Sequence, residues 1–182
     1  MKRSKVNLIV KKGDRGFSSL FSGERISKAS LRIDTLGDLD ELGAVLGIAR
    51  FHAKHKNVKD DILELQRDLF VAGSELATTK KMLKSLPKRV DQSFVDEFEA
   101  RVKRLHAITD IHEGFIIPGN VLSAAYINQA RTLTRRCERK IVELFQKKEM
   151  TNKELLRWFN RLSVYLFLLA RCEEKNPVFV KE

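Results

Sequence analysis

Apolar residues recur at every third or fourth position in five successive segments of this sequence, and this periodicity constrains the fold most strongly. Such spacing places apolar side chains along one side of an α-helix, which must then pack against other helices. The registers are Leu36, Leu39, Leu42, Leu46 and Ala49; Ile62, Leu65, Leu69, Ala72, Gly73 and Leu76; Phe94 or Val95, Phe98, Val102 and Leu105; Tyr126, Ala130, Leu133, Cys137, Ile141 and Leu144; and Leu155, Leu156, Trp158, Phe159, Leu162, Tyr165, Leu166, Phe167 and Leu169.

Capping and breaking residues predict where the first two helices begin and end. Asp34 or Thr35 is the expected N-cap of the first helix, because a side-chain oxygen there can accept a backbone N–H. The second helix is expected from about Val58 to about Leu86, since Pro87 cannot continue it. The dipole of the first helix is sufficient to explain the acidic residues near its start, which are Asp38, Asp40 and Glu41.

Similar signals mark the later helices. Asp91 or Ser93 is expected to open the third helix, and the fourth follows a break at residues 118–120. Thr151 with Glu154 three residues later forms a capping box, which predicts the start of the fifth helix. The fifth helix is apolar on more than one side, so it is expected to be central or to pack against another subunit.

These features predict an all-α fold, an antiparallel five-helix bundle in a single domain of 182 residues. The bundle is expected to span residues 34–176, after an N-terminal loop segment at 1–33. Neither an alternating strand pattern nor a shift in composition indicates a second unit.

The chain is strongly basic, with 35 Lys and Arg against 24 Asp and Glu and a net charge of +11. An excess of this size suits an anionic partner, which could be nucleic acid, a membrane surface or a phosphorylated small molecule. The sparse aromatic residues argue against a nucleic-acid groove. Cys137 and Cys172 fall on expected core faces, without metal-ligand spacing, so we interpret them as buried thiols of a cytoplasmic protein rather than a disulfide or reactive pair.

Two stretches could bind an anion. Gly13 and Gly16 flank Asp14 in a loop whose backbone N–H groups could cradle a phosphate, although an unoccupied surface loop has the same composition. On the fourth helix, Arg131, Arg135, Glu138 and Arg139 gather on one side, away from the apolar stripe. Arginines four residues apart repel one another, so the row indicates either a polyphosphate site or a solvated basic face.

Several motifs occur in one order along nearly the whole chain. They are Gly13-Asp14-x-Gly16, SGERISK at 22–28, LGDLDELGAVLGIAR at 36–50, LQRDLF at 65–70, FIIPG at 115–119, ARTLTRRCER at 130–139 and WFNRLS at 158–163. In this order and spacing, they resemble the ATP:cob(I)alamin (corrinoid) adenosyltransferases of the propanediol-utilisation type.

The resemblance implies a homotrimer that transfers the 5′-deoxyadenosyl group of ATP to the cobalt of reduced cobalamin or a related corrinoid, with release of triphosphate. It implies that Asp40 pairs with Arg131 across the subunit boundary, and that Phe115 excludes the lower axial ligand of the corrinoid. Mg²⁺ would be held through the phosphates of ATP rather than by protein ligands, and a reductase could supply electrons. ATP-binding roles are implied for Lys11, Gly13, Asp14, Gly16, Ser18, Lys28, Arg131, Arg135, Glu138, Arg139, Asn160 and Arg161.

The chemistry of the residues agrees with this assignment, because cobalt(I) is itself a strong nucleophile and the sequence offers no catalytic triad. Other interpretations remain open for single residues. Phe115 could be a core aromatic, and Asn160 with Arg161 could form an inter-helix contact. The sequence also departs from the family at some positions, which are Val10 for Thr, Phe17 for a small or hydroxyl residue, Gly43 for Asn, Asn120 for Gly and Val164 for Asp.

Three hypotheses follow. The first is a corrinoid adenosyltransferase. The second is a catalytically weakened relative that binds ATP or adenosylcobalamin as a carrier or sensor, since the carboxylate usual at the position of Val164 is missing. The third is a basic helical module for nucleic acid, whose affinity would depend steeply on salt.

Overall fold

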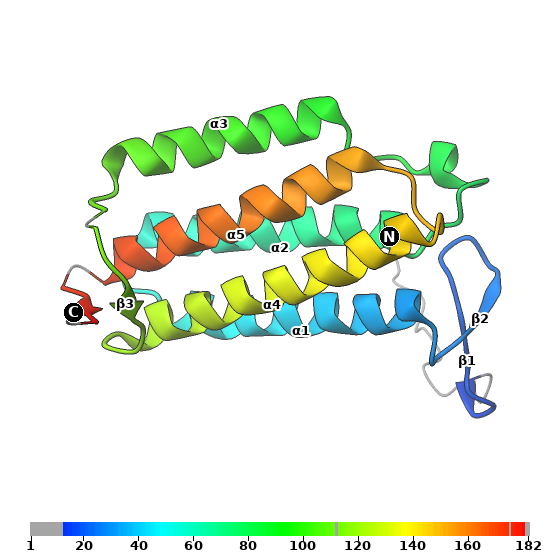
Figure 1. Ribbon diagram of the computed structural model, residues 1–182, viewed down its shortest axis with the longest axis horizontal. Helices are drawn as coiled ribbons and strands as arrows, with labels where there is room; N and C mark the ends of the chain where they lie inside the picture. The colour runs from blue at the N-terminus through cyan, green and yellow to red at the C-terminus, as the bar shows by residue number, and fades with distance from the viewer. Residues whose placement is uncertain (1–12, 112, 175, 181–182) are drawn as a thin grey trace, which may run out of the picture.

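Five α-helices dominate the computed structural model, which describes residues 13–111, 113–174 and 176–180 (Figure 1). They confirm the five helices predicted from the apolar periodicity. The helices are α1 (Leu31–His52), α2 (Lys56–Leu76), α3 (Gln92–Ile108), α4 (Leu122–Gln146) and α5 (Lys153–Glu173).

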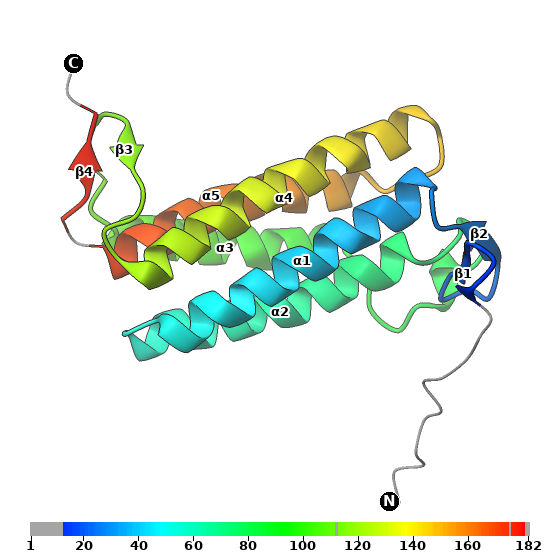
Figure 2. The same ribbon diagram turned by 90° about the horizontal axis from the view of Figure 1, so that it is seen from below.

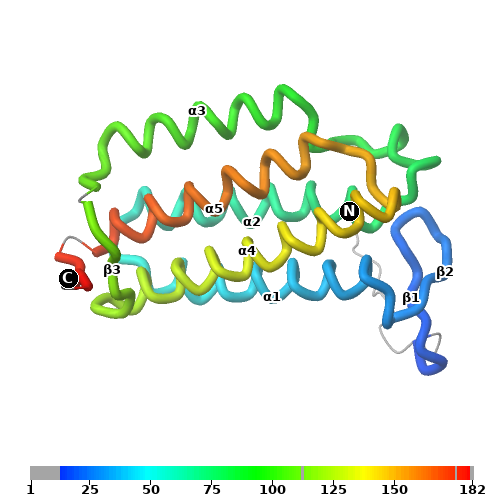
Figure 3. The backbone as a smooth tube through the Cα atoms, in the orientation of Figure 1, coloured from blue at the N-terminus to red at the C-terminus, as the bar shows by residue number. Residues whose placement is uncertain are grey.

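Each helix reverses the direction of the one before it, so α1 lies antiparallel to α2 and α4, and α4 lies antiparallel to α5 (Figure 3). Helix α3 packs on α5, and these two run in the same direction. Helix α5 contacts α2, α3 and α4, and this confirms its predicted central place. Trp158 and Phe159 of α5 are fully buried, and Phe98 of α3 packs against the indole at a ring-centroid distance of 5.7 Å.

The first helix begins earlier than predicted. Ser30, rather than Asp34 or Thr35, is its N-cap, and the Ser30 hydroxyl accepts the N–H of Ile33. The Thr35 hydroxyl instead donates to the carbonyl of Leu31 at 2.6 Å, inside the helix. The helical bundle therefore runs from residue 31 to residue 173.

The predicted end of the second helix at Leu86 is wrong. Helix α2 ends at Leu76, because the next carbonyl, that of Ala77, accepts the N–H of Phe21 at 2.7 Å. The following chain forms a loop with a short 3₁₀ turn, η2 (Leu83–Ser85). Lys80, Lys81 and Lys84 therefore lie in this loop rather than in the helix.

The third and fifth helices begin close to their predicted starts. Asp91 is the N-cap of α3, and its carboxylate accepts the N–H of Phe94 at 2.9 Å. Asn152, not Thr151, caps α5, because its side-chain oxygen accepts the N–H of Glu154 at 3.1 Å.

Two short antiparallel sheets lie at opposite ends of the bundle (Figure 2). The N-terminal hairpin, residues 13–28, contains β1 (Phe17–Ser19) and β2 (Arg25–Ser27). At the other end, β3 (Ile116–Ile117) pairs with β4 (Val178–Phe179). Sequence periodicity predicted neither sheet, because two or three residues are too few to show alternation.

Both cysteines are free thiols. Cys137 is buried, and burial raises the pKa of its thiol to about 12. Cys172 is half-buried. None of the helices in the described ranges is long and apolar enough to cross a membrane.

Candidate active site

The N-terminal hairpin brings part of the predicted phosphate loop together. The N–H of Gly16 donates to the carbonyl of Gly13, and the N–H of Lys28 donates to the carbonyl of Gly16 at 2.8 Å. Gly16 has a φ of 77°, which favours glycine. The Lys28 ammonium lies 3.2 Å from the place that a Cβ would take at Gly13. The lack of a side chain at Gly13 therefore lets the Lys28 ammonium approach the backbone of this loop.

The other predicted residues of this loop differ in exposure. Asp14 is exposed and Ser18 is half-buried in β1. Phe17, one of the departures from the family pattern, is also exposed, and the guanidinium of Arg25 lies 5.7 Å from its ring centroid. Lys11 and Val10 lie outside the described residues.

Helix α4 carries basic side chains with two different environments. Arg136 faces α1, where it pairs with Asp38 at 3.1 Å and with Glu41. Arg135 and Arg139, by contrast, are exposed and have no ion pair in the described part of the chain. Arg135 and Arg139, which are predicted to bind phosphate, are therefore not paired with any carboxylate of the described residues.

Arg131 is half-buried at the end of this row nearest the start of α4. Its Nε donates to the side-chain oxygen of Asn128 at 3.4 Å. Burial lowers the pKa of Arg131, and the like charges of Arg135 and Arg171 lower it further. A bound anion would relieve both effects.

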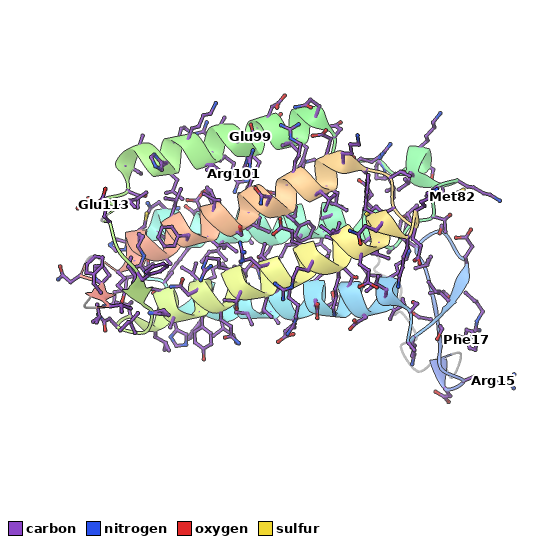
Figure 4. The ribbon with its side chains drawn as sticks, viewed as in Figure 1. Arg15, Phe17, Met82, Glu99, Arg101 and Glu113 are labelled. Atoms are coloured by element: carbon purple, nitrogen blue, oxygen red, sulfur yellow. The ribbon has the colours of Figure 1, made fainter. Side chains whose placement is uncertain are left out.

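Glu138, Asn160 and Arg161 form a chain of hydrogen bonds from α4 through α5 to α3. The amide of Asn160 donates to Glu138 at 3.1 Å, and Arg161 donates to the side-chain oxygen of Asn160 at 2.8 Å. Arg161 also donates to Glu99 at 3.0 Å, and this bond is the main cause of the lowered pKa of Glu99. Glu99 lies on α3 (Figure 4). Its carboxylate therefore neutralises part of the charge of Arg161 from the side of α5 that faces α3.

Phe115 is 84% exposed, so its interpretation as a core aromatic is wrong. It lines a pocket of about 410 Å³ together with Arg131, although sixteen positions separate them in the sequence. The carbonyl of Phe115 accepts the N–H of Val180 at 2.9 Å, next to the β3–β4 pairing. The full lining is Gly114, Phe115, Ile116, Pro118, Asn128, Arg131, Phe167 and Arg171, here called the Phe115 pocket.

Asp40 and the N-terminal hairpin lie apart from this pocket. Asp40 is exposed on α1 and lines a different groove, of about 350 Å³, between α1 and α2. Arg15 and Phe17 of the hairpin lie at one end of the bundle, whereas Glu113 marks the opposite end, close in sequence to Phe115 (Figure 4). Helix α4 alone spans about 36 Å between these ends at 1.5 Å per residue. The predicted site is therefore divided among three places on one chain.

Sequence reasoning missed most of the residues that line the Phe115 pocket, including three side chains on α4 and α5. Asn128 was hidden among ordinary helical positions, and Phe167 was assigned to the apolar stripe of α5. Arg171 is only 6% exposed, and a buried arginine in the otherwise apolar run LFLLAR could have drawn attention to it.

Comparisons with known proteins agree over most of the chain. Residues 8–173 match the sequence model of a family described as cobalamin adenosyltransferase. A corrinoid adenosyltransferase of Citrobacter freundii is 35% identical over 170 residues, which cover 93% of this chain and 96% of that protein. The corrinoid adenosyltransferase PduO of Salmonella typhimurium is 34% identical over 169 residues, and the match covers 93% of this chain but only 50% of PduO.

Solved structures show the same fold. A variant of a PduO-type ATP:corrinoid adenosyltransferase from Lactobacillus reuteri, complexed with cobalamin and ATP, superposes with a TM-score of 0.85 at 27% identity. The superposition covers 97% of this chain and all of that one. A second variant of the same kind, complexed with ATP, superposes with a TM-score of 0.84 at 26% identity.

Proposed function

This chain belongs to the cobalamin adenosyltransferase family, and we propose that it transfers the 5′-deoxyadenosyl group of ATP to the cobalt of cob(I)alamin or a related reduced corrinoid. One observation carries the assignment of the site. Phe115 lies in the same pocket as Arg131, the first residue of an arginine row on α4 that the bundle leaves without ion pairs among the described residues. The aromatic ring of Phe115 thus lies next to a cationic side chain. A site that binds an apolar corrinoid face beside an anionic nucleotide needs both.

Arg131, Arg135 and Arg139 are proposed to bind the phosphates of ATP. A guanidinium presents planar, forked donors that match phosphate oxygens, and it stays charged at every relevant pH. Glu138 lies among these arginines and, through its bond from Asn160, fixes the spacing between α4 and α5. We assign Asn160 and Arg161 to the nucleotide site, with Arg161 shared between ATP and Glu99.

The remaining ATP ligands are proposed to come from a second copy of the chain. Gly13, Gly16 and Lys28 lie in the hairpin, at the end of the bundle opposite β3, which directly follows Phe115 (Figure 2), so one copy does not bring them to its own pocket. A homotrimer with sites between subunits would do so, and it would let Asp40 of one copy pair with Arg131 of the next. The exposure of Asp40 in an open groove supports this arrangement.

Phe115 is proposed to act on the corrinoid. An exposed aromatic ring at the mouth of a pocket can exclude water and the lower axial donor from cobalt. Loss of that donor makes the cobalt(II) form easier to reduce, because an axial ligand destabilises the lower oxidation state. An electron donor, proposed to be a reductase, would then supply the cobalt(I) form.

The transfer step needs no side-chain nucleophile. Cobalt(I) attacks C5′ of ATP, a cobalt–carbon bond forms, and the C5′–O bond breaks with its electron pair moving onto triphosphate. The protein aligns the two reactants, an effect that can lower a barrier by about 7–11 kcal/mol in favourable cases. The arginine row stabilises the charge of the leaving triphosphate.

Mg²⁺ is proposed to enter on the phosphates of ATP. Within residues 13–111, 113–174 and 176–180, no three His, Cys, Asp or Glu side chains are grouped to hold a metal ion. Phosphate oxygens are themselves good ligands for this small cation, which commonly keeps several waters and few protein ligands. Bound there, it would offset the charge of the triphosphate.

One observation favours the carrier or sensor hypothesis as a second candidate. Val164 lies one turn beyond Asn160 on α5 and is 43% exposed, so an apolar side chain stands where the family pattern has a carboxylate. No comparable observation favours a nucleic-acid module.

The absorption spectrum of cobalamin tests these alternatives. Cobalamin is reduced to cob(I)alamin and followed with and without ATP and the protein. An adenosyltransferase forms adenosylcobalamin and triphosphate only when both ATP and the protein are present. Failure to form adenosylcobalamin would reject the proposed function. Saturable binding of ATP or adenosylcobalamin without turnover would then favour a carrier or sensor.

A further inference from the structure

A buried ion pair closes the end of α5 beside the Phe115 pocket. Arg171 donates from Nη2 to Oε2 of Glu174 at 2.7 Å, and the two side chains are 4% and 1% exposed. Arg171 also lines the pocket itself, and its guanidinium carbon lies 5.8 Å from the ring centroid of Phe167. The pair therefore joins the wall of the pocket to the end of the helix.

The second oxygen of Glu174 holds the turn that follows Phe115. Oε1 accepts the backbone N–H of Asn120 at 3.3 Å, and the Asn120 amide donates to the carbonyl of Asn176 at 3.1 Å. Gly119, just before this turn residue, has a φ of 137°, which strongly favours glycine. Two contacts thus hold the end of segment 115–120 against the C-terminal end of α5.

Stability alone is a poor explanation for this ion pair. Nε and Nη1 of Arg171 are buried without a hydrogen-bond partner in the described ranges, and unsatisfied donors weaken a fold. Replacing a buried ion pair by apolar residues of similar size is often neutral or stabilising. The presence of this ion pair beside a pocket is better explained if the pair fixes the conformation of segment 115–120.

We propose that Arg171 and Glu174 are positioning residues for the corrinoid half of the reaction, because they hold segment 115–120 so that Phe115 stays at the mouth of its pocket. This inference rests on the proposed function. It assigns neither residue a contact with ATP. It predicts that replacing the pair weakens the binding and reaction of the corrinoid and leaves the binding of ATP unchanged. Arg171 acts through Glu174 and Asn120, and the ring of Phe115 meets the corrinoid.

Glu173, the neighbouring residue, provides a matched control. It is also buried, but its carboxylate accepts the backbone N–H groups of Lys54 and His55 at 3.0 and 3.2 Å and the hydroxyl of Ser123 at 2.6 Å. These contacts tie the α1–α2 turn to the start of α4. Glu173→Gln should therefore reduce stability without changing the conformation of Phe115.

The test compares the double variant Arg171→Met/Glu174→Leu, which also removes the oxygen that accepts the Asn120 N–H, with Glu173→Gln and the unaltered protein. The double variant removes the pair without leaving a buried charge behind. We expect its KM for the corrinoid to rise about tenfold, with a KM for ATP within about twofold of normal, since only the corrinoid contact loses its alignment. Electron paramagnetic resonance of bound cob(II)alamin with ATP should show less of the form lacking an axial donor.

Three outcomes would overturn the inference while leaving the proposed function intact. They are an unchanged corrinoid KM, an equal rise in both KM values, and the same spectral change in Glu173→Gln. An unaltered protein that forms no adenosylcobalamin would reject the proposed function instead. If circular dichroism shows the double variant to be unfolded, Arg171→Lys decides, because Arg171 bonds Glu174 through a single nitrogen and a lysine keeps that charge pair. Kinetics and a spectrum like those of the unaltered protein would support the inference, and a raised corrinoid KM in the folded lysine variant would overturn it.

Discussion

Asn160 donates a hydrogen bond to Glu138 at 3.1 Å, and this contact joins α5 to the arginine-bearing side of α4. Glu138 lies beside Arg139 in the sequence and three positions after Arg135, so the contact places Asn160 of α5 next to the proposed phosphate-binding arginines. Arg136 lies on another side of the same helix and serves the bundle instead. Arg136 is paired with α1, whereas its neighbour Arg135 has no ion pair among the described residues. Substitutions at these two positions therefore test folding and ATP binding separately.

Arg135→Ala should impair the use of ATP far more than it affects the fold. Its side chain is exposed and has no ion pair in the described residues. A charge-assisted hydrogen bond contributes about 1.5–3 kcal/mol, so kcat/KM for ATP should fall about tenfold or more. Arg136→Ala is the control, and it should lower the melting temperature while leaving the KM for ATP unchanged. Equal losses of activity and helicity in Arg135→Ala would contradict the phosphate role.

Phe115→Ala should mainly slow the reaction that starts from cob(II)alamin. The ring is exposed, so its removal should leave the melting temperature unchanged, whereas truncation of the fully buried Trp158 should cost about 3–5 kcal/mol. The KM for ATP should stay near normal because Phe115 is proposed to act on the corrinoid and not on ATP. Steady-state kinetics with each substrate varied in turn would measure this, and a weakened ATP affinity with normal chemistry would remove Phe115 from the proposed role.

Asp40→Ala and Arg131→Ala should each inactivate the protein, yet a mixture of the two variants should regain part of the activity. A site between an Arg131→Ala chain and an Asp40→Ala chain can still contain one intact Asp40 and one intact Arg131. The test is to dissociate and reassemble the mixture before the assay. If activity does not return although mixed oligomers form, Asp40 and Arg131 do not act across a subunit boundary.

Stability should fall in acid partly through Glu173. Burial raises the pKa of this carboxyl, but hydrogen bonds from Ser123 and from the N–H groups of Lys54 and His55 outweigh burial and lower it below 4.5. A lowered folded-state pKa contributes stability that is present above the unfolded value and is lost as pH falls through the folded value. Urea midpoints between pH 3 and 7 should show this loss, and it should be smaller in Glu173→Gln.

Val164→Asp should raise turnover with Mg²⁺ severalfold if the missing carboxylate limits activity. The side chain is exposed, so a charge there should cost little stability. Ile48→Asp, at a similarly exposed apolar residue of α1, is the control and should leave turnover unchanged. An identical response of the two variants would show that position 164 has no special relation to the nucleotide.

The sequence was informative where local chemistry decides the structure. The apolar registers predicted all five helices, and Asp91 predicted a cap, because periodicity and side-chain capping act over a few residues. The end of α2 could not be predicted, since it depends on the contact between Ala77 and the distant Phe21.

The sequence indicated only part of the candidate site, and the roles of its residues stay predictions. The unpaired row of Arg135 and Arg139 was visible in the spacing of charges, and the family motifs pointed to Phe115. Arg171 was missed because its importance depends on a carboxylate at Glu174 and on a turn brought to it by the fold. Periodicity describes one helix at a time and does not report such contacts.

The N-terminal hairpin and β3, which directly follows Phe115, lie at opposite ends of the bundle (Figure 2), and this separation has a kinetic consequence. If each reaction centre needs the hairpin of one copy and the pocket of another, an isolated chain is inert. Specific activity would then decline on dilution, as assemblies dissociate into single copies. Saturating ATP should oppose that decline, since a ligand held by two copies at once favours the assembly that binds it.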